Sequence, residues 1–427
     1  IGEPYDYYAR FMPDMDDLRK CAYWMATGSG KTFLIHLAYL QFQHYNRGQY
    51  RLDIDRILLI TPNADLSAQH LREMKKSGIP CTEFDATGLS GYFQQHHAEA
   101  VNVIEITRFT EDKQDGGLRR VDIESFGNKN LVFVDEAHKG SGGEKWKSFR
   151  SEVAREGFTF EYSATFGQAA AGGSGDEDNL AAFAKTILFD YSYPHFYNDG
   201  YGKEYRILNV NKSAYETDRV LLANLLTYYE QKLVFEDIKD VATAEYNIAD
   251  PLWIFVGSRV NVSGTKSDVL TVVRFLQKVL TEQDWVVQTT DEFLRGKSGL
   301  IHEKTKHDLF DPAFPEQRLR YLRGRGLSAE EIYGDMLSRI FRCTEPAGLT
   351  LVQLKNTDGE IGLKSGDNDF FGDIYVGDAP KFIKIVEEHE PQIIVEKIDH
   401  RSLFRTIDDP KSTVNLLIGA KKFIEGW

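Results

Sequence analysis

The stretch MATGSGKT, residues 25–32, decides the fold of this chain. It follows a short apolar run, residues 21–24, and it opens an apolar segment that suits a helix, residues 33–42. A strand, a glycine-rich loop and a helix in this order are typical of a phosphate-binding P-loop. Gly28 and Gly30 let the backbone wrap closely around a polyphosphate, because a Cβ at either position would obstruct it. The pattern therefore predicts a nucleotide site at the start of the helix.

The residues of this loop have separate roles towards a bound nucleotide. Successive backbone N–H groups point at phosphate oxygens from the positive end of the helix. Lys31 reaches the β- and γ-phosphates, and the Thr32 hydroxyl binds Mg²⁺. The expected cofactors are therefore ATP and Mg²⁺. The expected nucleotide-binding residues in this loop are Thr27, Gly28, Ser29, Gly30, Lys31 and Thr32. The general pattern has a glycine where this chain has Met25, and a chance glycine-rich turn is the alternative.

A second element supports a nucleotide triphosphatase. Residues 131–134 form a continuous apolar run, which indicates a buried parallel strand. Asp135 follows at its carboxyl end, where open α/β sheets place their active sites. Asp135 can hold Mg²⁺ through water, and Glu136 can activate the attacking water. The alternative is a helix that begins with two acids, a position acids favour. We expect four catalytic residues: Lys31, Asp135, Glu136 and His138.

The order of these motifs resembles superfamily 2 helicases. MATGSGKT, the DEAH run at 135–138 and the SAT run at 163–165 look like motifs I, II and III. Residues 58–63 resemble motif Ia, a strand ending in a loop that touches the nucleic-acid backbone. The resemblance implies that Thr61 and Pro62 contact nucleic acid. It also implies that Ser163 and Thr165 couple hydrolysis to closure of two lobes.

A narrower likeness is to the motor subunit of type III restriction enzymes and related bacterial defence helicases. Trp24 before the P-loop, the run FEYSATF at 160–166 and the run GAKKFIEGW at 419–427 all look like that group. The likeness implies an ATP hydrolase coupled to translocation along nucleic acid, most of all double-stranded DNA. It also implies a methyltransferase or another defence subunit as a partner.

The expected fold is α/β, with two RecA-like domains that each contain a doubly wound parallel sheet. Apolar strands alternate with helix-compatible stretches through the first domain, residues 1–195, as such a sheet requires. The second domain is expected at residues 196–427, after a segment rich in tyrosine, glycine and asparagine. Strands are expected at 57–61, 101–106, 131–134, 158–162 and 187–190, and helices at 64–76 and 144–155.

Motifs IV and V place further candidates in the second domain. Residues 251–258 look like a buried strand entering a loop and resemble motif IV, with Ser258 or Arg259 as the candidate contact. Motif V would place Gly426 near the nucleotide and Ser412 or Thr413 near nucleic acid. The motif VI arginines have no match before Trp427, and Ile1 is not a methionine. We therefore expect the chain to be part of a longer protein whose C-terminal part is missing here.

The interval between motifs IV and V is much longer than the ~60 residues that two βαβ units need. We expect an inserted α+β module at about 290–375, with a helix at 329–342 and a hairpin at 349–364. Within that hairpin region Glu360, Lys364, Asp367 and Asp369 suggest a metal-dependent nuclease. Hairpins produce such polar clusters routinely, so the nuclease is the lesser of the two readings.

Composition limits the possible functions. The chain has 427 residues, 42% of them hydrophobic, and no apolar run long enough to span a membrane. Three cysteines far apart read as reduced thiols in a cytoplasmic protein. The formal charge of −14 argues against a broad basic surface for nucleic acid. It favours an alternative to a translocase, a nucleotide-dependent switch or scaffold. An RNA helicase is a further alternative.

Overall fold

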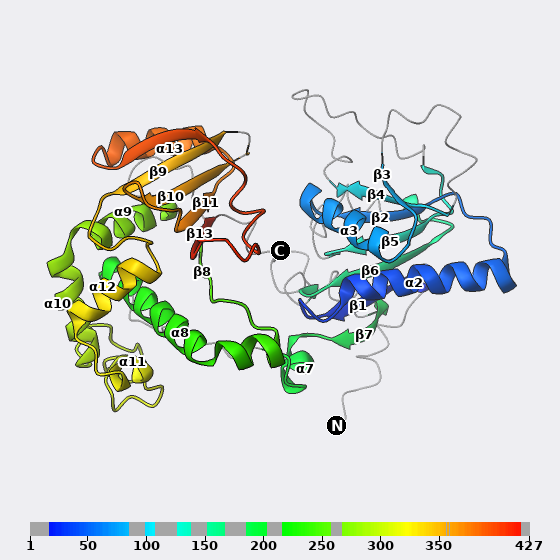
Figure 1. Cartoon of the computed structure of the whole chain (residues 1–427). Coiled ribbons are helices and arrows are strands. Elements are labelled where there is room, and N and C mark those ends of the chain that lie inside the picture. Colours follow the sequence, from blue (N-terminus) through cyan, green and yellow to red (C-terminus); the bar gives the residue numbers. More distant parts are fainter. Residues whose placement is uncertain are drawn as a thin grey trace. The chain divides into compact units, whose positions relative to one another are not determined.

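The computed structural model describes residues 17–84, 99–106, 126–137, 152–166, 185–202, 216–257, 267–355, 357 and 359–419. The chain divides into two compact units, Ile1–Tyr205 and Arg206–Trp427, which are described separately (Figure 1). A parallel α/β architecture was expected for both, and the first unit has it throughout its described sheet. The boundary of the two predicted domains at 195/196 stays a proposal.

Unit 1 contains a seven-stranded sheet in the order β3-β4-β2-β5-β6-β1-β7, with every pair parallel. Strands β2 and β5 are buried along their whole length, because the sheet is covered on both faces. Strand β6 lies between β1, which precedes the P-loop, and β5, which ends at Asp135. The strands are β1 Lys20–Met25, β2 Ile57–Thr61, β3 Cys81–Glu83, β4 Val101–Glu105, β5 Leu131–Asp135, β6 Phe158–Ser163 and β7 Ile187–Tyr191.

The helices of unit 1 start where the sequence indicates. Helix α2, Lys31–Tyr45, follows the P-loop and continues into a short π-helical turn, Asn46–Tyr50. Helix α3, Ala64–Lys76, begins at Asn63, whose side chain accepts a hydrogen bond from the Leu66 N–H and so caps the helix. The short elements are the 3₁₀ turn Asp17–Arg19 and helix α7, Tyr193–Asn198. Most of the expected helix at 144–155 lies outside the described residues.

Unit 2 contains a six-stranded sheet in the order β12-β9-β10-β11-β13-β8. It is mixed, whereas the sequence predicted a parallel sheet. Strands β11, β13 and β8 are parallel neighbours, and so are β12 and β9, but β10 is antiparallel to both of its neighbours. The strands are β8 Trp253–Val256, β9 Leu349–Lys355, β10 Glu360–Ser365, β11 Gly372–Tyr375, β12 Ile394–Asp399 and β13 Leu416–Gly419.

The segment predicted as an insertion, 290–375, has the helix and the hairpin that its sequence indicates. These elements belong to the core of unit 2. Strands β9, β10 and β11 separate β12 from β13 in the sheet, so removing them would break it into two parts. Leu349, Leu351 and Ile361 lie in the same hydrophobic cluster as Trp253 on β8. The predicted hairpin therefore supplies central strands of this unit.

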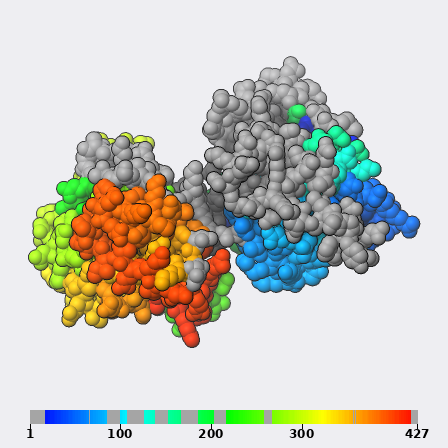
Figure 2. Space-filling view, turned by 90° about the horizontal axis from the view of Figure 1, so that it is seen from above, coloured from blue at the N-terminus to red at the C-terminus, as the bar shows by residue number. Residues whose placement is uncertain are grey.

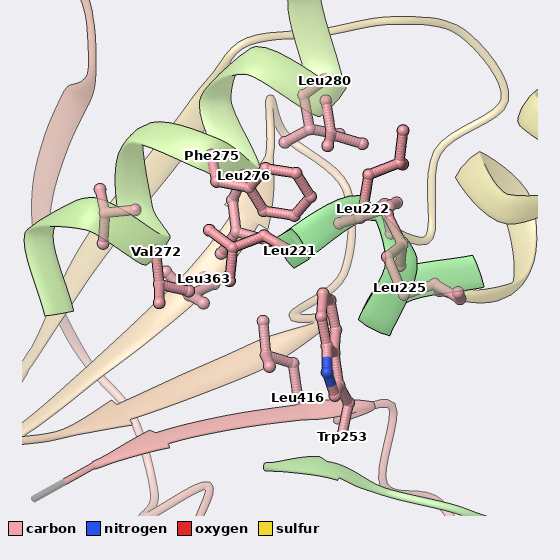
Figure 3. Packing of buried hydrophobic residues seen from close by; sticks show 14 of the residues in the cluster. Leu221, Leu222, Leu225, Trp253, Val272, Phe275, Leu276, Leu280, Leu363 and Leu416 are labelled. Carbon is pink, nitrogen blue, oxygen red and sulfur yellow. The ribbon is translucent and has the colours of Figure 1, made fainter. Parts of the chain in front are cut away.

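The helices of unit 2 form one core with the sheet (Figure 1). Leucines of α8 and the apolar side of α9 point towards the strands, and Trp253 and Leu416 close the cluster from the sheet side (Figure 3). One side of α13 lies at the surface of this unit in the view from above (Figure 2), while its apolar side is buried. The helices are α8 Thr217–Tyr246, α9 Asp268–Thr281, α10 Gln283–Leu294, α11 Arg320–Gly324, α12 Ala329–Arg339 and α13 Ala379–His389.

A buried polar network fixes the start of β13. The Asn415 side-chain amide donates to the carbonyls of Arg339 and Ile340, and its side-chain oxygen accepts from Lys232. The Tyr228 hydroxyl donates to the Asn415 backbone carbonyl. Buried polar groups are stable only when paired in this way. The network therefore attaches β13 to α8 and to the end of α12.

The three cysteines are free thiols, as expected. Burial raises the pKa of Cys21 to about 12, so its thiol stays protonated. Burial also raises the pKa of Cys81 and of Cys343. Among the described residues, no helix has both the length and the apolar character needed to cross a bilayer.

Candidate active site

The P-loop residues lie between β1 and α2, as predicted. Gly28 and Gly30 have φ of 82° and 98°, a backbone conformation that a residue with a Cβ rarely adopts. A Cβ built on either glycine would meet no atom of the described residues within 4 Å. The Ser29 N–H and hydroxyl both donate to the Ala26 carbonyl, which closes the loop.

The N-terminus of α2 begins after Gly30, an N-cap residue that has no side chain to cap the helix. The first turn of the helix contains no acidic residue. The first N–H groups of a helix have no partner within the helix, and the helix dipole is positive there. This arrangement suits an anion such as a polyphosphate. The loop geometry therefore fits the nucleotide role predicted for residues 27–32.

Lys31, Asp135 and Glu136 come together at the carboxyl end of the sheet. Nζ of Lys31 lies 3.1 Å from Oε1 of Glu136, and the two side chains are 11% and 13% exposed. Burial alone would raise the pKa of Asp135, but the hydrogen bond with His70 and the charges of His70 and Lys31 lower it. Asp135 is therefore a carboxylate, which is the form that binds a cation.

Glu136 has an unusual backbone conformation. Its φ is 50°, in the left-handed region that residues with a Cβ enter at a cost of about 1–3 kcal/mol. Its N–H donates to Oδ1 of Asp135 at 2.9 Å, which stabilises the turn at the end of β5. The turn directs the glutamate side chain to Lys31 of the P-loop. A conformation of this kind at the residue predicted as general base indicates a functional constraint.

His70 is the residue of this site that the sequence analysis missed. It lies on α3 with 2% of its surface exposed, and its Nε2 is 2.9 Å from Oδ2 of Asp135. The signal in the sequence was weak, because a histidine on an amphipathic helix usually has a structural role or faces solvent and is seldom part of an active site. Only the fold brings α3 against the end of β5.

Motif III is joined to the P-loop strand. Strands β6 and β1 are paired, with Trp24 opposite Ser163. The Trp24 indole N–H donates to the Ala164 carbonyl at 3.1 Å. Ser163 is buried, and its hydroxyl accepts from the Thr165 N–H at 3.0 Å. These hydrogen bonds hold the SAT segment in place beside β1. Its predicted coupling role would therefore depend on this contact with β1.

Thr61 differs from the expectation of a direct nucleic-acid contact. Its side chain is only 1% exposed, and its hydroxyl is 2.6 Å from the hydroxyl of Ser67 on α3. The threonine therefore braces the first turn of α3. Pro62 and Asn63 are partly exposed and follow directly, so any contact with a ligand at this loop falls to them.

Of the remaining predicted site residues, some are described by the structure and some are not. Thr413 is partly exposed, and its carbonyl accepts a hydrogen bond from Arg342 at 3.2 Å. Ser412 is also partly exposed. The other predicted site residues lie outside the described residues: the catalytic candidate His138, the nucleic-acid candidates Ser258 and Arg259, and the nucleotide-binding candidate Gly426.

The nuclease cluster does not form. Both carboxylate oxygens of Glu360 accept hydrogen bonds from the turn at residues 402–404, while Asp367 and Asp369 are exposed. Among the described residues, no three or more acidic, histidine or cysteine side chains are grouped to hold a metal ion. A nuclease centre at this hairpin therefore has no support.

Comparison with known families gives a match over residues 9–168, to the model described as "Type III restriction enzyme, res subunit". The matched segment contains the P-loop, the motif Ia strand, β5 with Asp135, and the SAT run. The resemblance inferred from the motifs is thereby confirmed for this part of the chain. No curated protein sequence matches the chain.

Several solved structures resemble the chain weakly. The UvsW helicase from Bacteriophage T4 matches with 16% identity and a TM-score of 0.27 over 40% of this chain, which spans about half (54%) of that protein. The Pyrococcus furiosus Hef helicase domain has 13% identity and a TM-score of 0.34, over 100% of this chain and 86% of that one. The Sulfolobus solfataricus SWI2/SNF2 ATPase core in complex with dsDNA has 10% identity and a TM-score of 0.29, over 98% of this chain and 86% of that one.

Proposed function

We propose that this chain, which carries a Res-subunit domain of the type III restriction enzymes at residues 9–168, is an ATP-driven translocase or helicase acting on double-stranded DNA. One observation carries the proposal. Three side chains come together at the end of a parallel sheet: the P-loop lysine Lys31, the ionised Asp135, and Glu136. A restriction or anti-phage system is the setting that the family of this domain suggests, with a methyltransferase or another defence subunit as partner.

The residues fit ATP and Mg²⁺. Lys31 and the N-terminal amides of α2 would hold the β- and γ-phosphates, while Thr32 and Asp135 would hold Mg²⁺. Mg²⁺, when bound, would neutralise negative charge on the phosphates. Glu136 would accept a proton from the attacking water, and for this its ion pair with Lys31 must open. Binding of the phosphates by Lys31 and release of Glu136 are thus one event.

Nucleic acid would be contacted from loops at the ends of strands. In the first unit this is the turn at Pro62 and Asn63, before α3. In the second unit it is the segment at Ser412 and Thr413, before β13, together with the predicted contacts at Ser258 and Arg259. Contacts of this kind bind the backbone and carry no sequence information. Changes in the nucleotide site would shift one set against the other and so move the chain along DNA.

The net charge of −14 favours a second candidate, an ATP-dependent switch that controls partner binding. An acidic protein attracts nucleic acid poorly at long range. A switch has the same nucleotide site but does not move along DNA. The two candidates therefore differ in movement and not in hydrolysis.

Displacement of a labelled third strand from a DNA triplex measures translocation without strand separation. We expect the protein to release the third strand only with ATP and Mg²⁺. Lys31→Ala is the matched control and should release none. ATP hydrolysis that leaves the triplex intact and ignores DNA would contradict the translocase and favour the switch.

A further inference from the structure

His70 makes the most unusual contact at the nucleotide site. It contacts Asp135 from helix α3. This helix is part of neither the P-loop nor the DEAH run. Both partners are buried, at 2% and 7% exposed. The Oδ1 atom of Asp135 accepts from the Glu136 N–H, and Oδ2 faces Nε2 of His70. The carboxylate is thus held from two sides.

The bonding of His70 indicates a donor whose role lies at Asp135. Its other ring nitrogen, Nδ1, is buried and has no hydrogen-bond partner in the part of the chain that the structure describes. A histidine retained only for packing would be replaced by an apolar residue at less cost, because an unpaired buried nitrogen is unfavourable. Because the Asp135 carboxylate can only accept a hydrogen bond, Nε2 of His70 is the donor in this contact.

The position of His70 is fixed on both sides along the inner face of α3. One turn before it, Ser67 is bonded to Thr61, and one turn after it Met74 is fully buried. Helix α3 therefore cannot rotate to release the ring without disturbing its own packing. Groups that orient a metal-binding carboxylate are held rigidly in this way.

We propose that His70 is a positioning residue for the divalent cation: through Nε2 it fixes the Asp135 carboxylate so that its remaining lone pairs face the water shell of Mg²⁺. The inference rests on the proposed nucleotide site. Beyond the proposed function, it states that His70, a side chain on α3, contributes to the affinity of the site for Mg²⁺. Loss of a group that orients a metal ligand lowers metal affinity about 10–100-fold.

The test measures binding of a fluorescent ATP analogue to the full-length protein, with and without a titration of MgCl₂. His70→Leu keeps the approximate volume and removes the donor, while His70→Gln can place an N–H near the position of Nε2. We expect His70→Leu to raise the half-saturating Mg²⁺ concentration by about 10–100-fold and to leave affinity for the analogue without Mg²⁺ unchanged. His70→Gln should recover part of the loss.

His36 offers a matched control. It is also buried on a helix of the first unit, with Nδ1 bonded to Ser77 and Nε2 unpaired in the described residues, and it has no hydrogen bond to Asp135. His36→Leu should lower thermal stability as His70→Leu does, yet keep the Mg²⁺ requirement of the wild type. Equal shifts in Mg²⁺ requirement for both leucine variants would overturn the proposal, because destabilisation alone would then explain them.

The wild-type titration separates this inference from the function on which it rests. If the wild type binds the analogue and Mg²⁺ strengthens binding, the nucleotide site stands. A folded His70→Leu or His70→Gln protein with the wild-type Mg²⁺ requirement would then contradict the role of His70 alone. If Mg²⁺ has no effect on the wild type, the metal role of Asp135 is wrong, and the role of His70 falls with it.

Discussion

Lys31 and Glu136 form an ion pair, with Nζ of the lysine 3.1 Å from Oε1 of the glutamate. The proposed chemistry needs each of these side chains elsewhere: the lysine on the phosphates and the glutamate on a water molecule. In the proposed mechanism the bound nucleotide would take over Lys31 and so release the glutamate. Substitutions of the two residues should therefore differ in their effect on ATP binding, although both should impair hydrolysis.

Glu136→Gln should bind ATP at least as tightly as the wild type, because Lys31 is no longer held by a carboxylate. Hydrolysis should fall about 100-fold or more, the contribution typical of a general base. Lys31→Ala should lose both binding and hydrolysis with the fold intact. Fluorescent-nucleotide binding and phosphate release measure the two effects, and circular dichroism checks the fold. Wild-type turnover by Glu136→Gln would refute its role as general base.

Trp24→Phe should slow hydrolysis without weakening ATP binding. The substitution removes the indole N–H that donates to Ala164 and leaves that carbonyl without this donor. The expected loss of stability is about 1 kcal/mol, typical of one hydrogen bond. Trp285→Phe, on α10 of the second unit, is the control and should keep the turnover of the wild type. Unchanged turnover in Trp24→Phe would show that the contact between motif III and β1 has no part in coupling.

Asp373→Asn should change how stability depends on pH. Burial and, to a lesser extent, the charge of Glu360 raise the pKa of Asp373 well above its usual value. The native state therefore keeps a proton that the unfolded state releases above about pH 4. The free energy of unfolding of the wild type should then fall, relative to Asp373→Asn, as pH rises from 4 through the raised pKa. Urea unfolding at several pH values measures this difference.

The control for that experiment is Asp367→Asn, since Asp367 is exposed in the loop after β10. It should follow the pH dependence of the wild type. A constant difference between wild type and Asp373→Asn across the pH range would mean that Asp373 is ionised in the folded protein. Its assignment as a neutral buried acid would then be wrong.

Deletion of residues 290–375 should prevent the second unit from folding, whereas the sequence alone suggested a removable module. The deletion takes out β9, β10 and β11, which separate β12 from β13 in the sheet. Thermal unfolding followed by circular dichroism should show loss of the transition that belongs to residues 206–427. A deletion protein that keeps this transition would restore the view of a separate module.

Much of the architecture was predictable because the decisive patterns are local. Buried parallel strands such as Ile57–Thr61 and Leu131–Asp135 read as continuous apolar runs, and Asn63 marks the start of α3. The glycine pattern of the P-loop predicted a backbone conformation that other residues rarely adopt, and Gly28 and Gly30 both have a positive φ. For the same reason Lys31, Asp135 and Glu136 could be proposed from motifs alone, and the structure brings them together.

What the sequence could not supply depends on pairing between distant segments. The hairpin at 349–364 gives no sign of whether it joins the main sheet or stands apart, and the antiparallel pairing of β10 decides this. The contact of His70 with Asp135 joins residues 65 positions apart in the sequence. It leaves no pattern in the residues around either of them.

The rate of ATP hydrolysis with and without duplex DNA tests the central claim most directly. We predict that the full-length protein hydrolyses ATP slowly alone and faster with duplex DNA of any sequence, because backbone contacts carry no sequence information. Stimulation should fall steeply as salt is added, since binding to phosphates releases counterions. An ATPase rate that neither duplex nor single-stranded DNA changes at low salt would contradict the motor, and the nucleotide-dependent switch would become the better account.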